Sequence, residues 1–363
     1  MTPGAGAAAI RDAMPRGLTS AEGLFVCPSC RGALSWETSL RCAACATTYL
    51  AADGTPCFND RGTYHGPIPP RPEMHRLLAL ARDIGYRAVL EEHLRATDPD
   101  LARYLTDTRR ADGLALLPLQ GTERVLDFGC SFGVLSRRLA SAAAQVVALD
   151  VTHEKLQFLG LVASQDGIAN LVPVCNGDPV RLPFADGSFD WVILNAVFEY
   201  LPRATGEPDV RRGHLRVLRE IGRVLRPGGG VYLATKNRLS YGALRSRRFH
   251  QLLPRPVARR LLGGGHRRDP DRHVIYTLGG YRRLFRDAGF TVSAAYWALP
   301  TLWYPRQMVA LTRGRAAAAR DVRRVTSAGG AKRAGWLAAA ATGLLPLVVP
   351  NYVFLLRWRG AGR

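Results

Sequence analysis

The chain has 363 residues, enough for one large or two modest domains, and its 47% hydrophobic content supports a substantial core. Basic residues outnumber acidic ones by 50 to 29, which gives a formal charge of +21. Nearly all of the basic residues are arginine, a bias typical of GC-rich genomes, so the charge favours anionic partners without indicating nucleic acid. Seven cysteines are an odd number and argue against a disulfide scaffold.

The N-terminal segment contains a candidate metal site. Residues 1–20 lack a long apolar run, so we expect a disordered tail rather than a signal peptide. Residues 21–62 then carry two CxxC pairs separated by eleven residues, a spacing that places four thiolates around one Zn²⁺. Four cysteine ligands leave no open coordination position, so the predicted zinc is structural, and reduced thiols indicate the cytoplasm. The four predicted ligands are Cys27, Cys30, Cys42 and Cys45.

The other three cysteines, Cys57, Cys130 and Cys175, do not fit this spacing and are predicted to be packing residues. Residues 63–118 begin with a Pro-rich linker. Helical periodicity follows over residues 73–117, with a break at Asp98-Pro99. We expect these helices to form a cap on the main domain.

From residue 119 to the C-terminus, short apolar runs alternate with amphipathic stretches. This alternation predicts an α/β domain with a mainly parallel sheet and helices on both faces. Two insertions, at about 237–274 and 300–345, are candidate substrate-binding elements. The predicted strands are RVLDF, QVVALD, LVPVCN, FDWVILN, GVYLAT, TVSAAYW and NYVFLLRW.

An uncharged stretch of 23 residues, 334–356, is long enough to cross a bilayer, which takes roughly 20 residues. However, Pro346, Pro350 and Asn351 interrupt it, and its end has a strand-like pattern. We therefore predict a short helix, a turn and a buried strand. A helix lying on the membrane surface is an intermediate alternative, so peripheral membrane contact remains open.

The most informative motif is residues 125–133, VLDFGCSFG, in which an apolar strand runs through an acidic residue into a glycine-bounded turn and a helix. Glycine allows a close backbone approach to a ligand, and the helix start presents free N–H groups. The motif is followed by QVVALD, by GDPVRLPFADGSFDWVILN and by LRPGGGVYLAT. This ordered series resembles the class I S-adenosylmethionine-dependent methyltransferases, of the type that modifies small molecules and glycans. The resemblance implies a Rossmann-like seven-stranded sheet.

The resemblance also implies the cofactor site for S-adenosyl-L-methionine. In the family, the acid at Asp150 accepts hydrogen bonds from the ribose hydroxyls, and the acid at Asp178 meets the adenine amino group. Asp127 anchors the glycine turn or reaches the methionyl amino group, and Asn195 faces the reacting methyl. The remaining predicted contacts are Gly129, Ser131 and Gly133, and the family most often has glycine where this chain has Ser131.

The sequence indicates less about the methyl acceptor than about the donor. The fourth strand is followed by NAVFEY rather than an NPPY-like tetrapeptide, which disfavours methylation of adenine or glutamine amino groups. A hydroxyl acceptor needs a base. The candidates are His273, Tyr276 and Glu199. The alternative is a surface position for His273, packing for Tyr276, and a cap or a pair on its helix for Glu199. Arginines between 245 and 272 are a candidate phosphate site or a solvated loop.

Three functions are therefore open. The first is O- or N-methylation of a small molecule, a sugar or a lipid-linked glycan. The second is methylation of ribosomal or transfer RNA, with the zinc ribbon docking the substrate. Here the ribbon is similar to small ribbon proteins that activate methyltransferases and to one fused to a ribosomal-RNA guanine methyltransferase. The third is a non-enzymatic ribbon scaffold with a cofactor-sensing domain. No DNA partner is expected.

Overall fold

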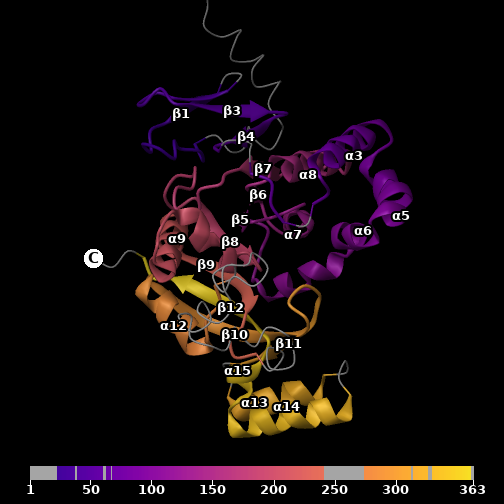
Figure 1. Cartoon of the computed structure of the whole chain (residues 1–363). Coiled ribbons are helices and arrows are strands. Elements are labelled where there is room, and N and C mark those ends of the chain that lie inside the picture. The colour runs from indigo at the N-terminus through magenta and orange to yellow at the C-terminus, as the bar shows by residue number, and fades with distance from the viewer. Residues whose placement is uncertain are drawn as a thin grey trace, which may run out of the picture. The chain divides into compact units, whose positions relative to one another are not determined.

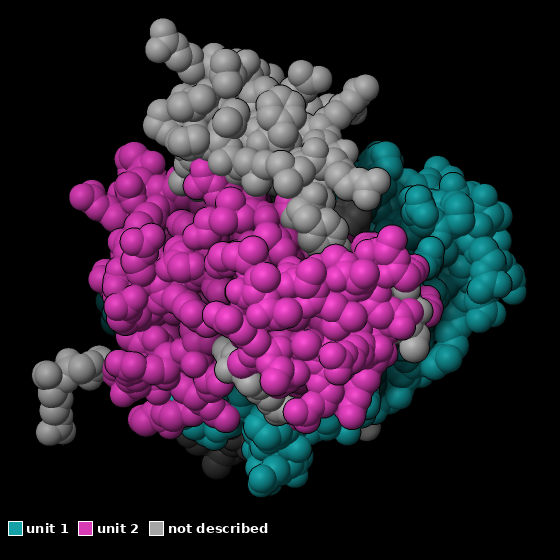
Figure 2. Space-filling model, turned by 90° about the horizontal axis from the view of Figure 1, so that it is seen from below, with its two compact units in different colours: residues 1–108, 118–192, 223–226 teal, residues 109–117, 193–222, 227–363 magenta. Residues whose placement is uncertain are grey.

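The computed structural model describes residues 23–36, 39–59, 63–66, 68–240, 274–311, 314–325 and 329–360. The chain divides into two compact units (Figure 2). The first unit comprises residues 1–108, 118–192 and 223–226, and the second comprises the remainder. The predicted tail at 1–20 and most of the predicted insertion at 237–274 lie outside the described residues.

The first unit is built on a sheet with the strand order β1-β2-β3-β4-β7-β6-β5-β8 (Figure 1). The pairs β5/β6 and β6/β7 are parallel. Residues 146–149 of β6 are fully buried, as expected for a parallel strand that is covered on both faces. The strands are β1 (Leu34–Trp36), β2 (Leu40–Cys42), β3 (Thr48–Ala52), β4 (Thr55–Cys57), β5 (Arg124–Phe128), β6 (Gln145–Asp150), β7 (Leu171–Cys175) and β8 (Phe189–Asn195).

The predicted zinc-ribbon region is joined to this sheet by a pairing that the sequence did not indicate. Strands β1 to β4 form antiparallel pairs with one another, but β4 lies parallel to β7 with Cys57 opposite Cys175. The backbone N–H of Phe58 also donates to the Cys175 carbonyl at 2.8 Å. The ribbon strands therefore extend the parallel sheet at the β7 edge.

The helices of the first unit include the predicted break at Asp98-Pro99 and a second break after Asp83 that the sequence analysis did not predict. The Asp98 carboxylate accepts from the Leu101 N–H at 2.9 Å and so starts a new helix. Arg71, at the start of the first helix, pairs with the buried Glu154 at 2.7 Å. The helices are α3 (Arg71–Asp83), α4 (Tyr86–Ala88), the π-helical turn η1 (Val89–Leu94), α5 (Arg95–Thr97), α6 (Pro99–Thr106), α7 (Val134–Ala140) and α8 (His153–Gln165).

The second unit contains the end of β8 and an antiparallel group in the order β9-β12-β10-β11 (Figure 1). The final strand inserts between β9 and β10, with Val353 opposite Ala234. All seven predicted strands form, which confirms the α/β prediction, and β11 is an additional strand within the 300–345 insertion. The strands are β9 (Leu225–Lys236), β10 (Phe290–Pro300), β11 (Pro305–Ala310) and β12 (Asn351–Trp358).

The helices of this unit include those predicted for the uncharged stretch at 334–356. That stretch forms the end of one helix, a short helical turn and β12. Within the described ranges, no helix combines the length and the apolar character needed to cross a bilayer. The helices are η2 (Thr108–Leu116), η3 (Phe198–Thr205), α9 (Val210–Val224), α12 (Leu278–Asp287), α13 (Arg315–Arg323), α14 (Gly330–Thr342) and α15 (Leu345–Val348), and η2 and α9 each extend into the first unit at one end.

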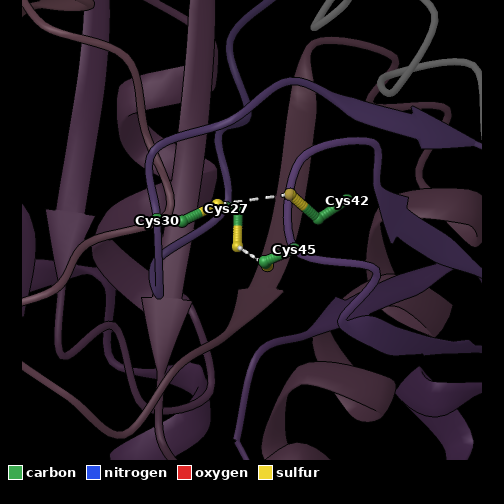
Figure 3. Close-up of side chains that lie close together, drawn as sticks. All are labelled: Cys27, Cys30, Cys42 and Cys45. Carbon is green, nitrogen blue, oxygen red and sulfur yellow. Dashed lines mark hydrogen bonds between the residues drawn. The ribbon is translucent and has the colours of Figure 1, made fainter.

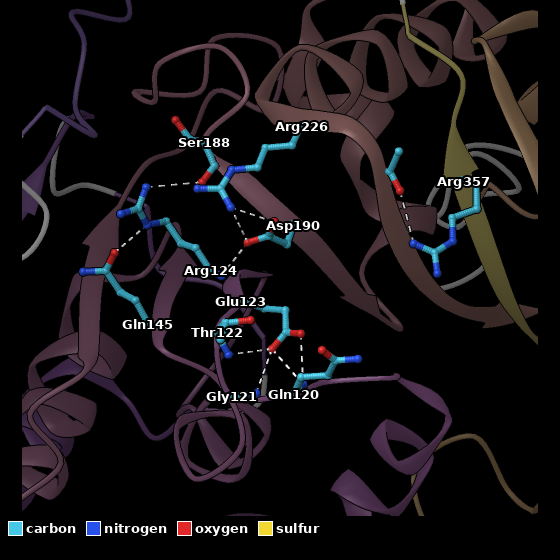
Figure 4. A network of polar contacts seen from close by, with 11 residues as sticks. Gln120, Gly121, Thr122, Glu123, Arg124, Gln145, Ser188, Asp190, Arg226 and Arg357 are labelled. Carbon is cyan, nitrogen blue, oxygen red and sulfur yellow. Dashed lines mark hydrogen bonds and ion pairs between the residues drawn. The ribbon is translucent and has the colours of Figure 1, made fainter.

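A network of polar side chains lies at the amino-terminal ends of the strands in the first unit (Figure 4). The Asp190 carboxylate accepts from the Arg124 N–H at 2.8 Å and from Arg226 Nη1 at 2.7 and 2.9 Å. The Arg124 side chain itself donates to Gln145 Oε1 at 2.7 Å. The Glu123 carboxylate accepts from three successive backbone N–H groups, of residues 120–122, and so holds the turn that precedes β5.

We expect Asp190→Ala to destabilise the protein by about 1–3 kcal/mol, because it leaves a backbone N–H and a guanidinium without their acceptor. The matched control is Asp186→Ala. Asp186 also pairs with an arginine, Arg223 at 2.6 Å, but its side chain is 80% exposed. Loss of the Asp186 side chain should lower the free energy of unfolding by less than about 0.5 kcal/mol. Urea unfolding followed by circular dichroism measures both, and equal losses would contradict this account of the network.

Candidate functional site

The loop between β5 and α7 has the backbone that the sequence motif predicts. Gly129 and Gly133 have φ values of +81° and +71°, a region that glycine enters without steric cost. The N–H groups of Gly129 and Cys130 donate to the Leu149 carbonyl at 2.8 and 3.0 Å, so the loop is held against the end of β6. A Cβ atom at Gly133 would lie 2.3 Å from the Leu159 side chain, so packing also requires glycine there.

Ser131 is the residue in this loop that departs from the family pattern. Its φ of +54° lies in the left-handed region, which costs a non-glycine residue about 1 kcal/mol. Its hydroxyl oxygen is buried and has no hydrogen-bond partner. Buried polar atoms in native proteins are nearly always satisfied, so this hydroxyl fits a loop that contacts a polar ligand.

Asp150 connects this loop to the start of α8. Its Oδ2 accepts from the Ser131 N–H at 2.9 Å, and its Oδ1 accepts from the Thr152 N–H at 3.0 Å. A carboxylate has about four acceptor positions, so two remain for a pair of ligand hydroxyls. The residue is half-buried at the end of β6. Asp150 can therefore fix the loop and bind a ligand at the same time.

Asp127 lies inside the fold. It is 2% exposed, and its Oδ2 accepts from the Ser136 hydroxyl of α7 at 2.6 Å. This bond joins β5 to the helix that follows the loop. Burial raises the pKa of the neighbouring Cys130 thiol well above its ordinary value, and the charges of Asp150 and Asp127 raise it further. These surroundings disfavour the thiolate form of Cys130.

Asp178 lies in the loop that follows β7. Its Oδ1 accepts from the Val180 N–H at 2.9 Å, and its side chain is 41% exposed. Asn176 ties this loop to the end of β6, because its N–H donates to the Asp150 carbonyl at 3.0 Å and its amide donates to the Asp178 carbonyl at 2.8 Å. The first unit thus gathers the glycine loop, Asp150 and Asp178 at the carboxyl ends of adjacent parallel strands, where open α/β sheets bind ligands.

In the second unit, Asn195 is the last residue of β8 and is half-buried. Nearby in the chain, the predicted candidate Glu199 is 1% exposed and pairs with Lys236 at 3.2 Å. The Thr235 hydroxyl also donates to Glu199 Oε2 at 3.4 Å. The Glu199 carboxylate therefore takes part in an ion pair with the last residue of β9, a different element from its own helix.

Tyr276, a second predicted candidate, contacts a histidine that the sequence analysis did not single out. His214 of α9 is fully buried, with Nε2 at 3.0 Å from the Phe198 carbonyl and Nδ1 at 2.9 Å from the Tyr276 hydroxyl. A carbonyl only accepts, so Nε2 carries the proton, and Nδ1 accepts from Tyr276. The sequence signal for this pair is a single histidine, His214, within the amphipathic helix α9. The third candidate, His273, and the arginines at 245–272 lie outside the described residues.

The four ribbon cysteines converge as predicted (Figure 3). The sulfur atoms of Cys27 and Cys45 are 3.7 Å apart, and those of Cys30 and Cys42 are 3.4 Å apart. All four sulfurs lie within 4.8 Å of one another. Tetrahedral zinc–thiolate bonds of about 2.3 Å would place the sulfurs about 3.8 Å apart, so the arrangement fits one zinc ion.

Comparison with known proteins identifies the same stretch of chain. A sequence profile described as "Methyltransferase domain" matches residues 126–233. The biotin biosynthesis bifunctional protein BioHC of Cellvibrio japonicus is 34% identical over 35% of this chain and 23% of its own length. Sterol 24-C-methyltransferase ERG6B of Gibberella zeae is 32% identical over 30% of this chain and 27% of its own.

The ubiquinone biosynthesis O-methyltransferase of Xanthomonas axonopodis pv. citri is 32% identical over 32% of this chain and 44% of its own length. The chain thus spans about a quarter to just under half of the length of these curated relatives. The profile match at residues 126–233 includes the glycine loop, Asp150 and Asp178. The stretch from β5 into β9 is therefore a class I S-adenosylmethionine-dependent methyltransferase domain.

Proposed function

We propose that this protein methylates a small molecule, at an oxygen or nitrogen atom of a sugar, a lipid-linked glycan or a similar metabolite. The observation that carries the proposal is the Asp150 carboxylate, which holds the glycine loop and keeps acceptor positions free at the carboxyl end of β6. The named relatives methylate oxygen in one case and carbon in another, and they support small-molecule methylation in general.

The residues of the first unit fit the donor S-adenosyl-L-methionine. Asp150 would accept from the two ribose hydroxyls, and Asp178 would accept from the adenine amino group. The unpartnered Ser131 hydroxyl would meet a polar group of the methionyl part, next to Gly129 and Gly133. When bound, the donor supplies an electrophilic methyl group, and the protein then mainly aligns the acceptor with it. Asn195 is the residue we assign to the acceptor side.

For a hydroxyl acceptor, we assign the base to the Tyr276–His214 pair. The acceptor proton would pass to the Tyr276 oxygen while the Tyr276 proton passes to His214 Nδ1. The Phe198 carbonyl keeps its bond to Nε2–H, which orients the ring for this transfer. The Phe198 ring stacks on the imidazole at 4.2 Å and holds it in place.

We further propose that Cys27, Cys30, Cys42 and Cys45 hold a structural Zn²⁺ and that the protein works in the reducing cytoplasm. Arg31 follows the first CxxC pair and Ala46 follows the second, and both residues have left-handed backbone conformations with positive φ. The two turns therefore share one geometry. A small ribbon buries little core, so the metal would supply much of its folding energy.

The acceptor class is tested by transfer of tritiated methyl from S-adenosyl-L-methionine to fractions of a cell extract. Label in the low-molecular-weight or lipid-glycan fraction supports the proposal. Label that appears only in the RNA fraction contradicts it and favours the ribbon-guided RNA activity.

We expect Asp150→Asn to weaken donor binding by roughly 10- to 100-fold, because hydrogen bonds to a charged acceptor contribute about 1.5–3 kcal/mol. Asparagine keeps the shape and one acceptor oxygen, so one of the two backbone N–H bonds, from Ser131 or Thr152, is lost together with the charge. The control is Asp166→Asn, since Asp166 accepts from Tyr86 and Arg87 and takes no part in the loop. Calorimetric titration with S-adenosyl-L-methionine measures both, and an unchanged affinity for Asp150→Asn would refute the assigned site.

Ser131→Gly should have opposite effects on stability and binding. Glycine relieves the left-handed strain and removes the unpartnered hydroxyl, so the unliganded protein should gain up to about 1 kcal/mol. Donor affinity should fall about tenfold, as one hydrogen bond is lost. Ser131→Ala is the matched control, because it loses the hydroxyl but keeps the strain. Thermal unfolding with and without donor separates the two effects, and a Ser131→Gly variant with full affinity would remove Ser131 from the site.

Tyr276→Phe should lower the rate of transfer to a hydroxyl acceptor by about 10²- to 10⁴-fold while leaving donor affinity unchanged. His214→Gln should lower the rate in the same way. The control is Tyr281→Phe. Burial raises the pKa of Tyr281, and its hydroxyl bonds to Thr235, so its removal should affect stability alone. Single-turnover kinetics measure the transfer step, and a normal rate for Tyr276→Phe would eliminate this base.

A further inference from the structure

The three cysteines outside the ribbon are not equivalent, because the fold brings two of them together with a histidine. Cys57 ends β4 and Cys175 ends β7, directly opposite each other in the parallel pair. His153 is the first residue of α8. The two sulfurs and a ring nitrogen of His153 lie within 4.8 Å of one another. The sequence prediction that Cys57 and Cys175 are ordinary packing residues does not account for this histidine.

The His153 imidazole is the unusual member of this group. It is 5% exposed, and neither ring nitrogen has a hydrogen-bond partner. Cys57 and Cys175 are 2% and 0% exposed, so solvent does not reach the group. Burying an imidazole without partners costs free energy, and such a buried orphan in a native protein points to a ligand that satisfies it.

A fourth donor atom completes the group. Asn59 Oδ1 lies 2.9 Å from Cys175 Sγ and 3.3 Å from Cys57 Sγ. The Asn59 amide nitrogen faces the Val151 carbonyl at 3.5 Å, which fixes the oxygen as the end that points to the sulfurs. Two sulfurs and one imidazole therefore lie close together, and one oxygen contacts both sulfurs. Because Asn59 lies two residues after Cys57, a single short segment supplies half of the donors.

We propose that Cys57, His153 and Cys175 bind a second zinc ion, with the Asn59 side-chain oxygen as the fourth ligand. Thiolate and imidazole ligands in a four-coordinate arrangement select Zn²⁺ over the hard cations Mg²⁺ and Ca²⁺. On binding, the two S–H bonds break, two zinc–sulfur bonds form, and two protons leave to solvent. No oxidation or reduction is involved.

The site joins elements that are distant in the sequence. It links the last ribbon strand to β7 and to the start of α8, where a single backbone pair, Cys57 with Cys175, defines the β4–β7 register. The metal would therefore act as a cross-link between the ribbon and the parallel sheet. This role does not depend on methyl transfer.

The test is the metal content of the full-length chain, purified under reducing conditions and measured by inductively coupled plasma mass spectrometry. Wild type should contain two zinc equivalents, one in the ribbon and one in the new site. Cys57→Ser and His153→Asn should each reduce the content to one. The matched control Cys130→Ser, another buried cysteine that belongs to neither cluster, should keep two.

Two outcomes would overturn the proposal. One is a wild-type content of one equivalent or less that neither Cys57→Ser nor His153→Asn changes. The other is an intact mass lower by two hydrogens, with a Cys57–Cys175 disulfide in the peptide map of protein kept under non-reducing conditions.

A measurement on the wild type alone guards against variants that fail to fold. Metal-free protein is titrated with Co²⁺, whose near-ultraviolet charge-transfer absorbance follows the number of bound thiolates. The absorbance should continue to rise beyond the first equivalent, because this site adds two thiolates to the four of the ribbon. Saturation at one equivalent would reject the second site.

Discussion

The conformation of the candidate donor site depends on one carboxylate. Asp150 ends β6 and accepts an N–H from the loop after β5 and another from the turn into α8. These two segments come from different crossovers of the parallel sheet. Because each Asp150 oxygen keeps a free lone pair, the same charge can organise the loop and bind hydroxyl groups. Structural and binding roles thus fall on one residue.

Apolar and polar residues are separated along the strands in the same way in both units. The bodies of β5, β6 and β8 are mainly buried apolar residues, with the buried Asp127 of β5 as an exception, and most of the other polar residues occur at or next to the strand ends. In the first unit, the carboxyl ends carry Asp150 and the loop of Asp178. In the second unit, Lys236 ends β9 and pairs with Glu199. Since parallel strands place their carboxyl ends at one edge, the polar groups of the first unit gather where ligands can reach them without disturbing the core.

The cysteines show how differently one residue type behaves in different surroundings. The ribbon sulfurs come from two tight turns, and sequence spacing alone brings each pair together. Cys130 is an isolated buried thiol with a raised pKa. Cys57 and Cys175 meet only because β4 pairs with β7. Their histidine neighbour comes from the crossover between β6 and β7, which places three distant segments around one point.

The sequence by itself determined the local features of this protein. Strand positions such as 124–128, 145–150 and 351–358 follow from apolar runs bounded by turn residues, and the helix start at Asp98-Pro99 follows from a cap and a proline. The CxxC pairs and the glycine loop also depend on residues only a few positions apart. Steric preferences and hydrogen bonds within a short segment fix such features, so a linear pattern can encode them.

Only the tertiary structure decided the features that join remote segments. The β4–β7 pairing, the His214–Tyr276 contact and the group of Cys57, His153 and Cys175 each depend on strand order and on crossovers dozens of residues long. A single histidine or cysteine has the same local signal whether it packs, pairs or binds a ligand. The role of such a residue depends on which backbone segments pack around it. The strand order of the whole sheet determines which segments those are.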